Sequence, residues 1–265
     1  MSRTTDRGSK VGILVPALNE ARSIAAVVGE CLATDCANTV LVVDDGSVDH
    51  TGAIAARAGA TVLRNASKGG VGFSLRRGFR YLRRHECEIV ITLDGDGAHD
   101  PALIPALLEC HYEQTADLTV GSRFLPGKQS SIPSAKAAAN HFATALINRV
   151  LGSQFSDVAS GMRVFGRKAL RLSATSSNFA IAFEMLVLSF REGLRVAECP
   201  IEVRYDAGEL FCTNRQELLD LVKFALQSSL GNERRSRALE LLRERIEGYE
   251  LFFVTIDGRE IYGRA

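Results

Sequence analysis

Two pairs of carboxylates are the residues in this sequence whose types and spacing most clearly suit chemistry. Asp44 and Asp45 directly follow the β-branched run Thr39–Val43, and Asp94 and Asp96 follow a second apolar run. Crowded carboxylates repel each other and lose hydration, so they need hydrogen-bond donors or a cation nearby. Four carboxylates in one crevice suit an oxygen-ligated Mg²⁺ or Mn²⁺ shared with a diphosphate. Each pair taken alone also suits a turn or a helix cap.

Alternating strand and helix patterns indicate how the chain positions those carboxylates. Strands are expected over residues 11–15, 39–43, 60–64, 88–93 and 117–120, with short extended segments at 164–165 and 195–205. Helices are expected over residues 20–34, 51–58, 71–85, 134–151, 179–192 and 215–230, with another starting at Pro101 behind the N-cap Asp100. This order predicts an α/β fold with a mostly parallel sheet and helices on both faces.

The predicted sheet has a consequence for ligand binding. Ligands of such sheets bind beyond the carboxyl ends of the strands. Four polar or Gly-rich loops should therefore converge on one crevice, namely residues 16–20, 44–47, 94–96 and 121–123.

Composition excludes several classes of protein. The chain has 265 residues, with 32 Lys and Arg against 31 Asp and Glu, so its net charge is +1. This balance argues against a nucleic-acid binder and against bulk disorder. The six cysteines form no C-x-x-C pair and are expected to be reduced, mostly buried thiols of a cytoplasmic protein. The sequence shows neither a signal peptide nor the roughly 18–20 apolar residues of a membrane span.

The chain divides into three predicted parts. Residues 1–10 are polar and are expected to be a disordered lead-in, and residues 11–231 form the main domain. Residues 232–265 change character, with a charged helix and a hairpin around Ile256-Asp257-Gly258. This tail either packs on the domain or makes a homodimer contact.

Seven short segments occur in an order that matches a known family. They are Val15-Pro-Ala-Leu-Asn-Glu20, Val43-Asp-Asp-Gly-Ser47 with Asp49 and Thr51, Lys68-Gly69-Gly70 through Gly78, Leu93-Asp-Gly-Asp96 with Asp100-Pro101, Gly121-Ser-Arg-Phe124, Asp157-x-x-Ser-Gly-Met-Arg163 and Ala197-Glu-Cys-Pro-Ile201. Over residues 11–230 the set resembles glycosyltransferase family 2, and within it the dolichyl-phosphate mannosyltransferase-like branch of polyprenyl-phosphate glycosyltransferases. The resemblance implies a GT-A fold and metal-dependent transfer of a sugar, with inversion, from a UDP- or GDP-linked donor.

The resemblance also implies roles for residues on the donor side. Asp96 would be the main ligand of Mg²⁺ or Mn²⁺, with Asp94 as a second ligand that also contacts the donor sugar or ribose. The nucleotide-sugar site would comprise Pro16, Ala17, Asn19, Glu20, Asp44, Asp45, Ser47, Lys68, Asp94 and Gly95. Asn19 and Glu20 are equally compatible with a helix N-terminus, and the two interpretations are not exclusive.

On the acceptor side, the resemblance assigns a polyprenyl phosphate to Arg123 and to a second cation, Lys136, at a position where Arg is more usual. Ser160 and Arg163 are further expected acceptor-binding residues. An anionic phosphate acceptor needs positioning more than deprotonation. A hydroxyl acceptor would instead need a base, for which Glu184 is the first candidate and Asp157 the second. Asp157 and Arg163 are also compatible with a structural pair that shapes their loop.

Three departures from the family keep other functions open. Ala98 stands where Gln is frequent, so a metal ligand is lost or replaced by water. Residues 206–211 lack the usual Ser and Lys, and no membrane helices follow. The expectation is a cytoplasmic enzyme, peripheral at the inner face of the membrane, with polyprenyl phosphate as acceptor. The alternatives are transfer to the hydroxyl of a soluble or natural-product acceptor, and a degenerate nucleotide-sugar-binding scaffold.

Five arginines crowd the helix expected over residues 71–85, and this basic stripe has two interpretations. They are Arg76, Arg77, Arg80, Arg83 and Arg84. The stripe is either a solvated face opposite a core-facing one, or a surface attracted to anionic lipid headgroups.

Overall fold

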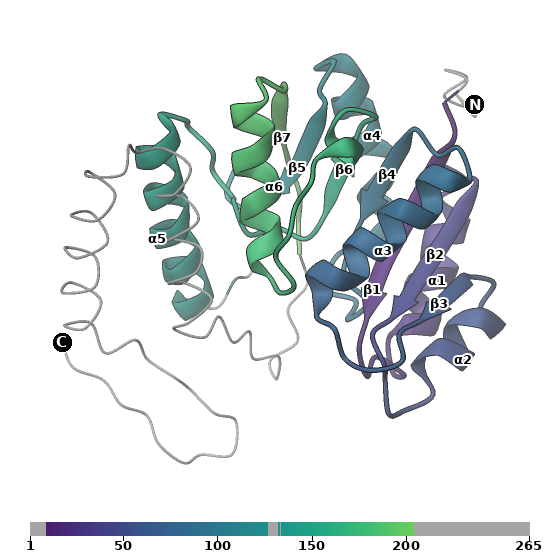
Figure 1. The fold of residues 1–265 in the computed structure, drawn as a ribbon. Coiled ribbons are helices and arrows are strands. Elements are labelled where there is room, and N and C mark those ends of the chain that lie inside the picture. The colour runs from purple at the N-terminus through teal and green to yellow at the C-terminus, as the bar shows by residue number, and fades with distance from the viewer. Residues whose placement is uncertain (1–8, 127–131, 133, 204–265) are drawn as a thin grey trace, which may run out of the picture.

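The computed structural model describes residues 9–126, 132 and 134–203 of the chain. Within these ranges one sheet of seven strands runs through the molecule in the order β3-β2-β1-β4-β6-β5-β7 (Figure 1). The predicted tail, the helix expected over 215–230 and the segment 206–211 lie outside the described residues, as does most of the predicted lead-in.

The elements have the following bounds. The strands are β1 (Val11–Ala17), β2 (Thr39–Asp44), β3 (Thr61–Arg64), β4 (Ile89–Thr92), β5 (Leu118–Ser122), β6 (Arg163–Phe165) and β7 (Val196–Pro200). The helices are α1 (Ile24–Ala33), α2 (Thr51–Arg57), α3 (Val71–Arg84), α4 (Ile104–Glu113), α5 (Ser134–Leu151) and α6 (Ala180–Arg191), with short 3₁₀ helices at Pro101–Leu103 and Ala169–Arg171.

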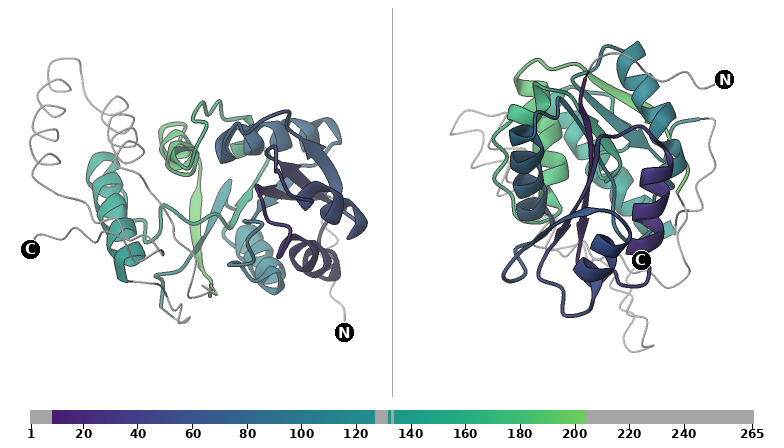
Figure 2. Two further views of the ribbon diagram at one scale, coloured as in Figure 1. Left: turned by 90° about the horizontal axis from the view of Figure 1, so that it is seen from below. Right: turned by 90° about the vertical axis from the view of Figure 1, so that its right-hand side faces the viewer.

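Helices cover both faces of the sheet, as the sequence pattern predicts. Strand β1 shows why, because its apolar side chains alternate between two clusters and six of its seven residues are buried. Leu14 packs in the cluster beneath α3 and α6, whereas Ile13 and Val15 pack in the cluster beneath α1 and α4. Figure 2 shows α3 and α6 on one side of the sheet and α1 and α4 on the other.

The close approach of α3 to the sheet depends on a small residue. At Gly78 an added Cβ would overlap the side chain of Leu14 on β1. The apolar face of α3 buries Phe79 and Leu82 in the same cluster. This packing fixes the N-terminus of α3 beside the carboxyl ends of β2 and β3, where the candidate site lies.

The strands lie close to their predicted positions, and one orientation goes beyond the prediction. Strand β6 is the short extended segment expected at 164–165, and it runs antiparallel to both β4 and β5. Strand β7 returns parallel to β5, with Val120 opposite Glu198. The loop that precedes β6 therefore lies at the same edge of the sheet as the carboxyl ends of β4 and β5.

Two helix predictions illustrate what local signals determine. The helix expected over residues 134–151 is confirmed with both ends in place. Asp100 is the predicted cap, and its Oδ1 accepts from the N–H of Ala102 at 2.9 Å.

Within the described ranges, none of the helices combines the length and the apolar character that a membrane span requires. The five described cysteines are free thiols, of which Cys31 and Cys87 are buried.

Candidate active site

The loops that follow β1 and β2 interlock at the carboxyl edge of the sheet, where the sequence predicts the ligand-binding crevice, and together they form a wall of polar residues. Asn19 has φ +60°, and its N–H donates to Ser47 Oγ at 3.0 Å. In return, the N–H of Val48 donates to Asn19 Oδ1 at 2.9 Å. The N–H of Glu20 donates to Thr51 Oγ1 at 2.8 Å, which joins the same wall to the start of α2. Three of the expected nucleotide-binding residues, Asn19, Glu20 and Ser47, are thus brought together.

Asp44 lies fully buried at the end of β2 and shapes the turn that follows it. Its Oδ1 accepts from the N–H of Ser47 at 2.8 Å, and Arg64 Nη1 lies 3.7 Å from Oδ2. No hydrogen bond reaches Oδ2 within the described structure. The cation and donor expected beside the acidic pair are therefore present. For Asp44, they support the turn-forming interpretation.

Asp45 anchors the segment that leads into α3. Its carboxylate accepts from four donors, namely Asn65 Nδ2 at 2.6 Å, Gly69 N at 3.0 Å, Gly70 N at 2.8 Å and Ser74 Oγ at 3.0 Å. A carboxylate with this many donors is well suited to fixing a loop. Lys68, at the start of that loop, is exposed.

The carboxyl end of β4 presents the second acidic pair. Asp94 is half-buried, and an added Cβ at Gly161 would lie 2.5 Å from its Oδ2, so the glycine makes room for this carboxylate. Burial raises the pKa of Asp94, and the charges of Arg123 and Arg163 act in the opposite direction. Asp96 is also half-buried, and its Oδ1 accepts from the N–H of Ala98 at 2.9 Å.

His99 lies beside this pair and was not among the predicted site residues. It is 4% exposed, and its Nδ1 lies 3.4 Å from Asp94 Oδ2. Neither ring nitrogen has a hydrogen-bond partner in the described structure. Burial lowers the pKa of His99 to about 4, against the opposing charge of Asp96. The sequence signal available was its place three residues after Asp96, next to the departure at Ala98.

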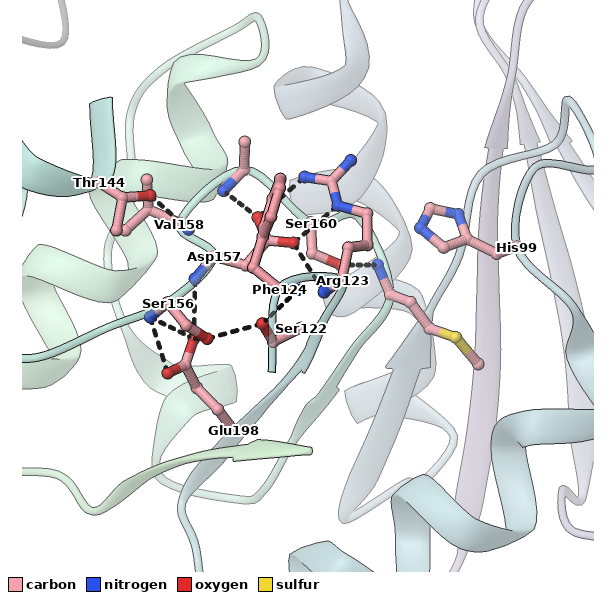
Figure 3. A network of polar contacts seen from close by, with 12 residues as sticks. His99, Ser122, Arg123, Phe124, Thr144, Ser156, Asp157, Val158, Ser160 and Glu198 are labelled. Atoms are coloured by element: carbon pink, nitrogen blue, oxygen red, sulfur yellow. Dashed lines mark hydrogen bonds and ion pairs between the residues drawn. The ribbon is translucent and has the colours of Figure 1, made fainter. Parts of the chain in front are cut away.

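Arg123 and Asp157 form a paired unit at the carboxyl end of β5 (Figure 3). Arg123 Nε donates to Asp157 Oδ2 at 2.6 Å, and Nη2 donates to Oδ1 at 2.8 Å. The backbone N–H of Arg123 also donates to Oδ2, at 3.1 Å. Burial opposes the ionisation of Asp157, but the bonds and charge of Arg123 outweigh it and hold its pKa below the usual range. Asp157 is therefore an anion committed to orienting Arg123.

The loop that precedes β6 is held together by Arg163, which is 2% exposed. Its three guanidinium nitrogens donate to the carbonyls of Ser160, Ala182 and Val158 at 2.6–2.8 Å. Burial lowers its pKa to about 10. From the sequence, Asp157 and Arg163 were considered as a structural pair. That pairing is wrong, because Asp157 is paired with Arg123 instead. Ser160 is fully buried, and its Oγ accepts from the N–H of Met162.

Glu184, the first candidate base, is enclosed within α6. It is 2% exposed, and its two oxygens accept from Thr175 N at 2.8 Å, Thr175 Oγ1 at 3.0 Å and Ser176 N at 2.7 Å. The segment it holds reaches α3, where Ser177 O accepts from Gly72 N at 2.7 Å. These contacts describe a residue that joins α6 to the N-terminus of α3. The function proposed below therefore gives Glu184, Arg163 and Ser160 structural roles.

The remaining predicted site residues are Pro16, Ala17, Gly95 and Lys136. Pro16 and Ala17 form the end of β1, and Gly95 O accepts from Ser23 Oγ at 2.7 Å. Lys136 lies in the first turn of α5, which follows the β5 loop. In the basic stripe, Arg76, Arg77 and Arg83 donate to the backbone carbonyls of neighbouring segments. These hydrogen bonds give the three side chains a structural role, which does not require a lipid surface.

The acidic residues fit a metal ion that is shared with a ligand. The described part of the chain holds no group of three or more His, Cys, Asp or Glu side chains placed to bind a metal. The four carboxylates expected in one cluster are instead divided, because Asp44 and Asp45 are engaged on the α2 and α3 side. Asp94 and Asp96 remain at the crevice, and Mg²⁺ typically binds through one or two carboxylates together with substrate phosphates.

An α/β sheet with polar loops at the carboxyl ends of its strands defines a broad class, and solved structures narrow it to the GT-A fold. Glucosyl-3-phosphoglycerate synthase of Mycobacterium tuberculosis has a TM-score of 0.66 and 21% identity, covering 84% of this chain and 81% of that one. A structure of the same enzyme was solved with Mn²⁺, UDP-glucose and phosphoglyceric acid, with a TM-score of 0.67 and 19% identity, covering 84% and 80% of the two chains.

The family follows from the sequence comparison. Residues 12–172 match the model of glycosyl transferase family 2, and the chain belongs to that family. The undecaprenyl-phosphate mannosyltransferase of Micrococcus luteus is 30% identical over 211 residues, which cover 76% of this chain and 86% of the relative. The polyprenol monophosphomannose synthase of Mycolicibacterium smegmatis is 29% identical, covering 71% and 75%. These relatives confirm the predicted polyprenyl-phosphate branch of the family and show that the chain is a glycosyltransferase.

Proposed function

We propose that this protein transfers a hexose from a nucleotide-diphosphate sugar to the phosphate of a polyprenyl phosphate, with inversion at the anomeric carbon. The observation that carries the acceptor assignment is Arg123, which Asp157 holds in a fixed orientation at the carboxyl end of β5. A planar guanidinium held in this way is well suited to binding a phosphate. The names of the relatives in Micrococcus luteus and Mycolicibacterium smegmatis support the same acceptor class.

On the donor side, the proposal uses the wall built from the β1 and β2 loops. Asn19, Glu20 and Ser47 would bound the pocket of the base and ribose, while Asp44 and Asp45 keep the underlying loops in place. Lys68 would meet the negative charge of the donor. Asp94 and Asp96 would hold a Mg²⁺ or Mn²⁺, which stabilises the charge that develops on the departing diphosphate.

The transfer is a single displacement in this proposal. An oxygen of the acceptor phosphate forms a bond to the anomeric carbon, on the face opposite the diphosphate. The bond from the anomeric carbon to the diphosphate oxygen breaks, and its electron pair leaves with the diphosphate. Arg123, together with Lys136, orients the attacking phosphate so that it approaches in line.

The contacts of the two candidate bases, Glu184 and Asp157, also favour a phosphate acceptor. An anionic phosphate oxygen needs no general base, whereas a hydroxyl acceptor does. Glu184 is buried with both oxygens accepting hydrogen bonds, and Asp157 is ion-paired with Arg123. Because the acceptor carries a long apolar chain, we propose that the protein works at a membrane surface.

A panel of donors and acceptors tests this proposal. GDP-mannose and UDP-glucose would each be offered with undecaprenyl phosphate, with undecaprenol and with soluble sugars, in Mg²⁺ or Mn²⁺. The proposal expects nucleotide diphosphate and a glycosyl-phospholipid to form together, with undecaprenyl phosphate only. Product on undecaprenol or on a soluble sugar would support a hydroxyl acceptor instead. Asp96→Ala is expected to abolish turnover in a folded protein.

A further inference from the structure

Glu198, on the edge strand β7, accepts hydrogen bonds from the start of the loop that carries Asp157 (Figure 3). Its Oε1 accepts from the backbone N–H groups of Ser156 at 3.0 Å and Asp157 at 2.9 Å. Its Oε2 accepts from the same N–H of Ser156 at 2.8 Å, and Oε1 also accepts from Ser156 Oγ at 2.9 Å. One carboxylate thus gathers both consecutive N–H groups and the hydroxyl at the start of the Asp157 loop.

These contacts continue to Arg123 by two routes. On the first route, Glu198 fixes the backbone of Asp157, whose carboxylate binds the guanidinium of Arg123 through Nε and Nη2. On the second, Ser156 Oγ lies 2.6 Å from Ser122 Oγ, which in turn accepts from the N–H of Phe124 at 3.2 Å. Ser122 and Phe124 are the neighbours of Arg123 in the chain, so the side chain and the backbone of Arg123 are both tied to Glu198.

The pairing of β5 with β7 explains why Glu198 can influence the placement of Arg123. Strands β5 and β7 are parallel, and Glu198 pairs in register with Val120, three residues before Arg123. The Asp157 loop has no strand pairing of its own at this point, and its backbone bond to β5 comes only at Met162, whose O accepts from Gly121 N at 2.8 Å. The place of residues 156–157 relative to β5 therefore depends on side-chain contacts. A charged acceptor of N–H groups makes stronger hydrogen bonds than a neutral one, which favours Glu over Gln here.

We propose that Glu198 is a positioning residue for the acceptor phosphate, acting through Ser156 and Asp157 on the orientation of Arg123. This inference rests on the proposed function, in which Arg123 binds that phosphate. Glu198 itself touches neither substrate. Its loss should therefore weaken acceptor use far more than donor binding, because the hydrogen bonds of Glu198 go to Ser156 and Asp157 and not to Asn19, Ser47 or Asp94.

A double-mutant cycle tests this dependence on Arg123. Steady-state rates would be measured for the wild type, Glu198→Gln, Arg123→Ala and the double variant, with undecaprenyl phosphate and whichever of GDP-mannose or UDP-glucose is turned over. We expect Glu198→Gln to raise the acceptor KM roughly tenfold or more, since small displacements of positioning groups are costly. The donor KM should stay within twofold, and the double variant should be no worse than Arg123→Ala.

A matched control distinguishes a positioning role of Glu198 from a general contribution to the pairing of β5 with β7. Asp117 lies at the opposite end of the same β5–β7 edge, and its Oδ2 accepts from the N–H of Arg195 at 3.0 Å. Asp117→Asn therefore removes a comparable carboxylate from the same edge, far along the strands from Arg123. We expect it to leave both KM values unchanged. Ser156→Ala is the milder second variant, to be used if Glu198→Gln fails to fold, and it should raise only the acceptor KM.

A spectroscopic readout keeps the inference separable from the proposed function. The Nε–H resonance of Arg123, assigned by its loss in Arg123→Lys, reports the bond to Asp157 without any substrate. We expect Glu198→Gln to shift or broaden it, and Asp117→Asn to leave it in place. If the wild type does not use undecaprenyl phosphate, the proposed function fails, and this resonance alone decides the positioning role. An unchanged resonance, equal rises in both KM values, or losses that add to those of Arg123→Ala would overturn the inference.

Discussion

Arg123 and Asp157 are joined by two parallel hydrogen bonds of 2.6 and 2.8 Å, and both side chains are withdrawn from solvent, 12% and 0% exposed respectively. Breaking a buried ion pair by removing one partner is costly, because it leaves a charge uncompensated. Asp157→Asn is therefore expected to lower the free energy of unfolding by about 3 kcal/mol. Urea denaturation at pH 7 measures this change.

The double variant Asp157→Asn/Arg123→Gln provides the control for that prediction. With both charges removed, no unpaired ion remains, and part of the lost stability should return. If the double variant is as unstable as the sum of the two single variants, the pair is not the source of the effect.

A second prediction concerns stability in acid and depends on His111 of α4. This imidazole is 4% exposed, its Nδ1 lies 2.9 Å from Thr119 Oγ1, and burial lowers its pKa to about 4. The unfolded chain takes up this proton near pH 6.5, so the protein should lose stability as the pH falls from about 6.5 towards 4. At pH 5 the loss attributable to His111 should be about 2 kcal/mol.

His111→Gln removes the titrating group while keeping a polar side chain of similar length. The difference in unfolding free energy between pH 7.5 and pH 5 should therefore be smaller in this variant than in the wild type. An identical pH dependence in the two proteins would show that His111 is not buried as the neutral imidazole.

A third prediction uses the space that Gly161 leaves for Asp94. A Cβ at this position would lie 2.5 Å from Asp94 Oδ2, so Gly161→Ala must displace the carboxylate. We expect turnover to fall by roughly 100-fold, because a displacement of about 1 Å in such a site has that cost. The apparent Mn²⁺ concentration required for half-maximal activity should rise as well.

Gly29→Ala is the matched control for Gly161→Ala. Gly29 lies in α1, and an added Cβ there meets no atom within 4 Å. This substitution should leave turnover unchanged and raise helix stability slightly. Wild-type turnover and metal dependence in Gly161→Ala would contradict the placement of Asp94 at the reacting centre.

A fourth prediction separates structure from chemistry at Glu184. Glu184→Gln replaces a charged acceptor by an amide whose nitrogen would face the N–H groups of Thr175 or Ser176. We expect the free energy of unfolding to fall by about 1–3 kcal/mol, as when buried donors lose their acceptor. The rate per folded molecule should change by less than tenfold. A complete loss of turnover without any loss of stability would restore Glu184 as a candidate base.

The sequence was sufficient to predict the strands, most helix bounds and the edge of the sheet at which the candidate site residues gather. Apolar runs such as residues 11–15 indicate buried parallel strands wherever they occur. The partners of individual carboxylates could not be predicted, because they depend on contacts between distant segments. Asp45 shows this, since its donors come from residues 65–74, and its engagement there leaves the acidic cluster at the crevice smaller than predicted.

The acceptor side shows the same limit. The sequence drew attention to Arg123 and Asp157 separately, and only the antiparallel insertion of β6 brings the Asp157 loop against β5. Glu198 stood within a recognised motif, but no local signal linked it to Arg123. Its position beside the Asp157 loop follows from the parallel register of β5 and β7. Local sequence patterns do not specify which strands pair or in which register.

The most direct test of the account is the kinetic behaviour of Arg123→Ala with undecaprenyl phosphate as acceptor. If Arg123 holds the acceptor phosphate, the variant should raise the acceptor KM by roughly 10- to 100-fold, in line with the loss of a charged hydrogen-bond pair. The donor KM and the nucleotide affinity should change far less, since the influence of Arg123 on that side is the action of its charge on Asp94. Equal losses for donor and acceptor, or an unchanged acceptor KM, would contradict the central claim that this side of the crevice binds a lipid phosphate.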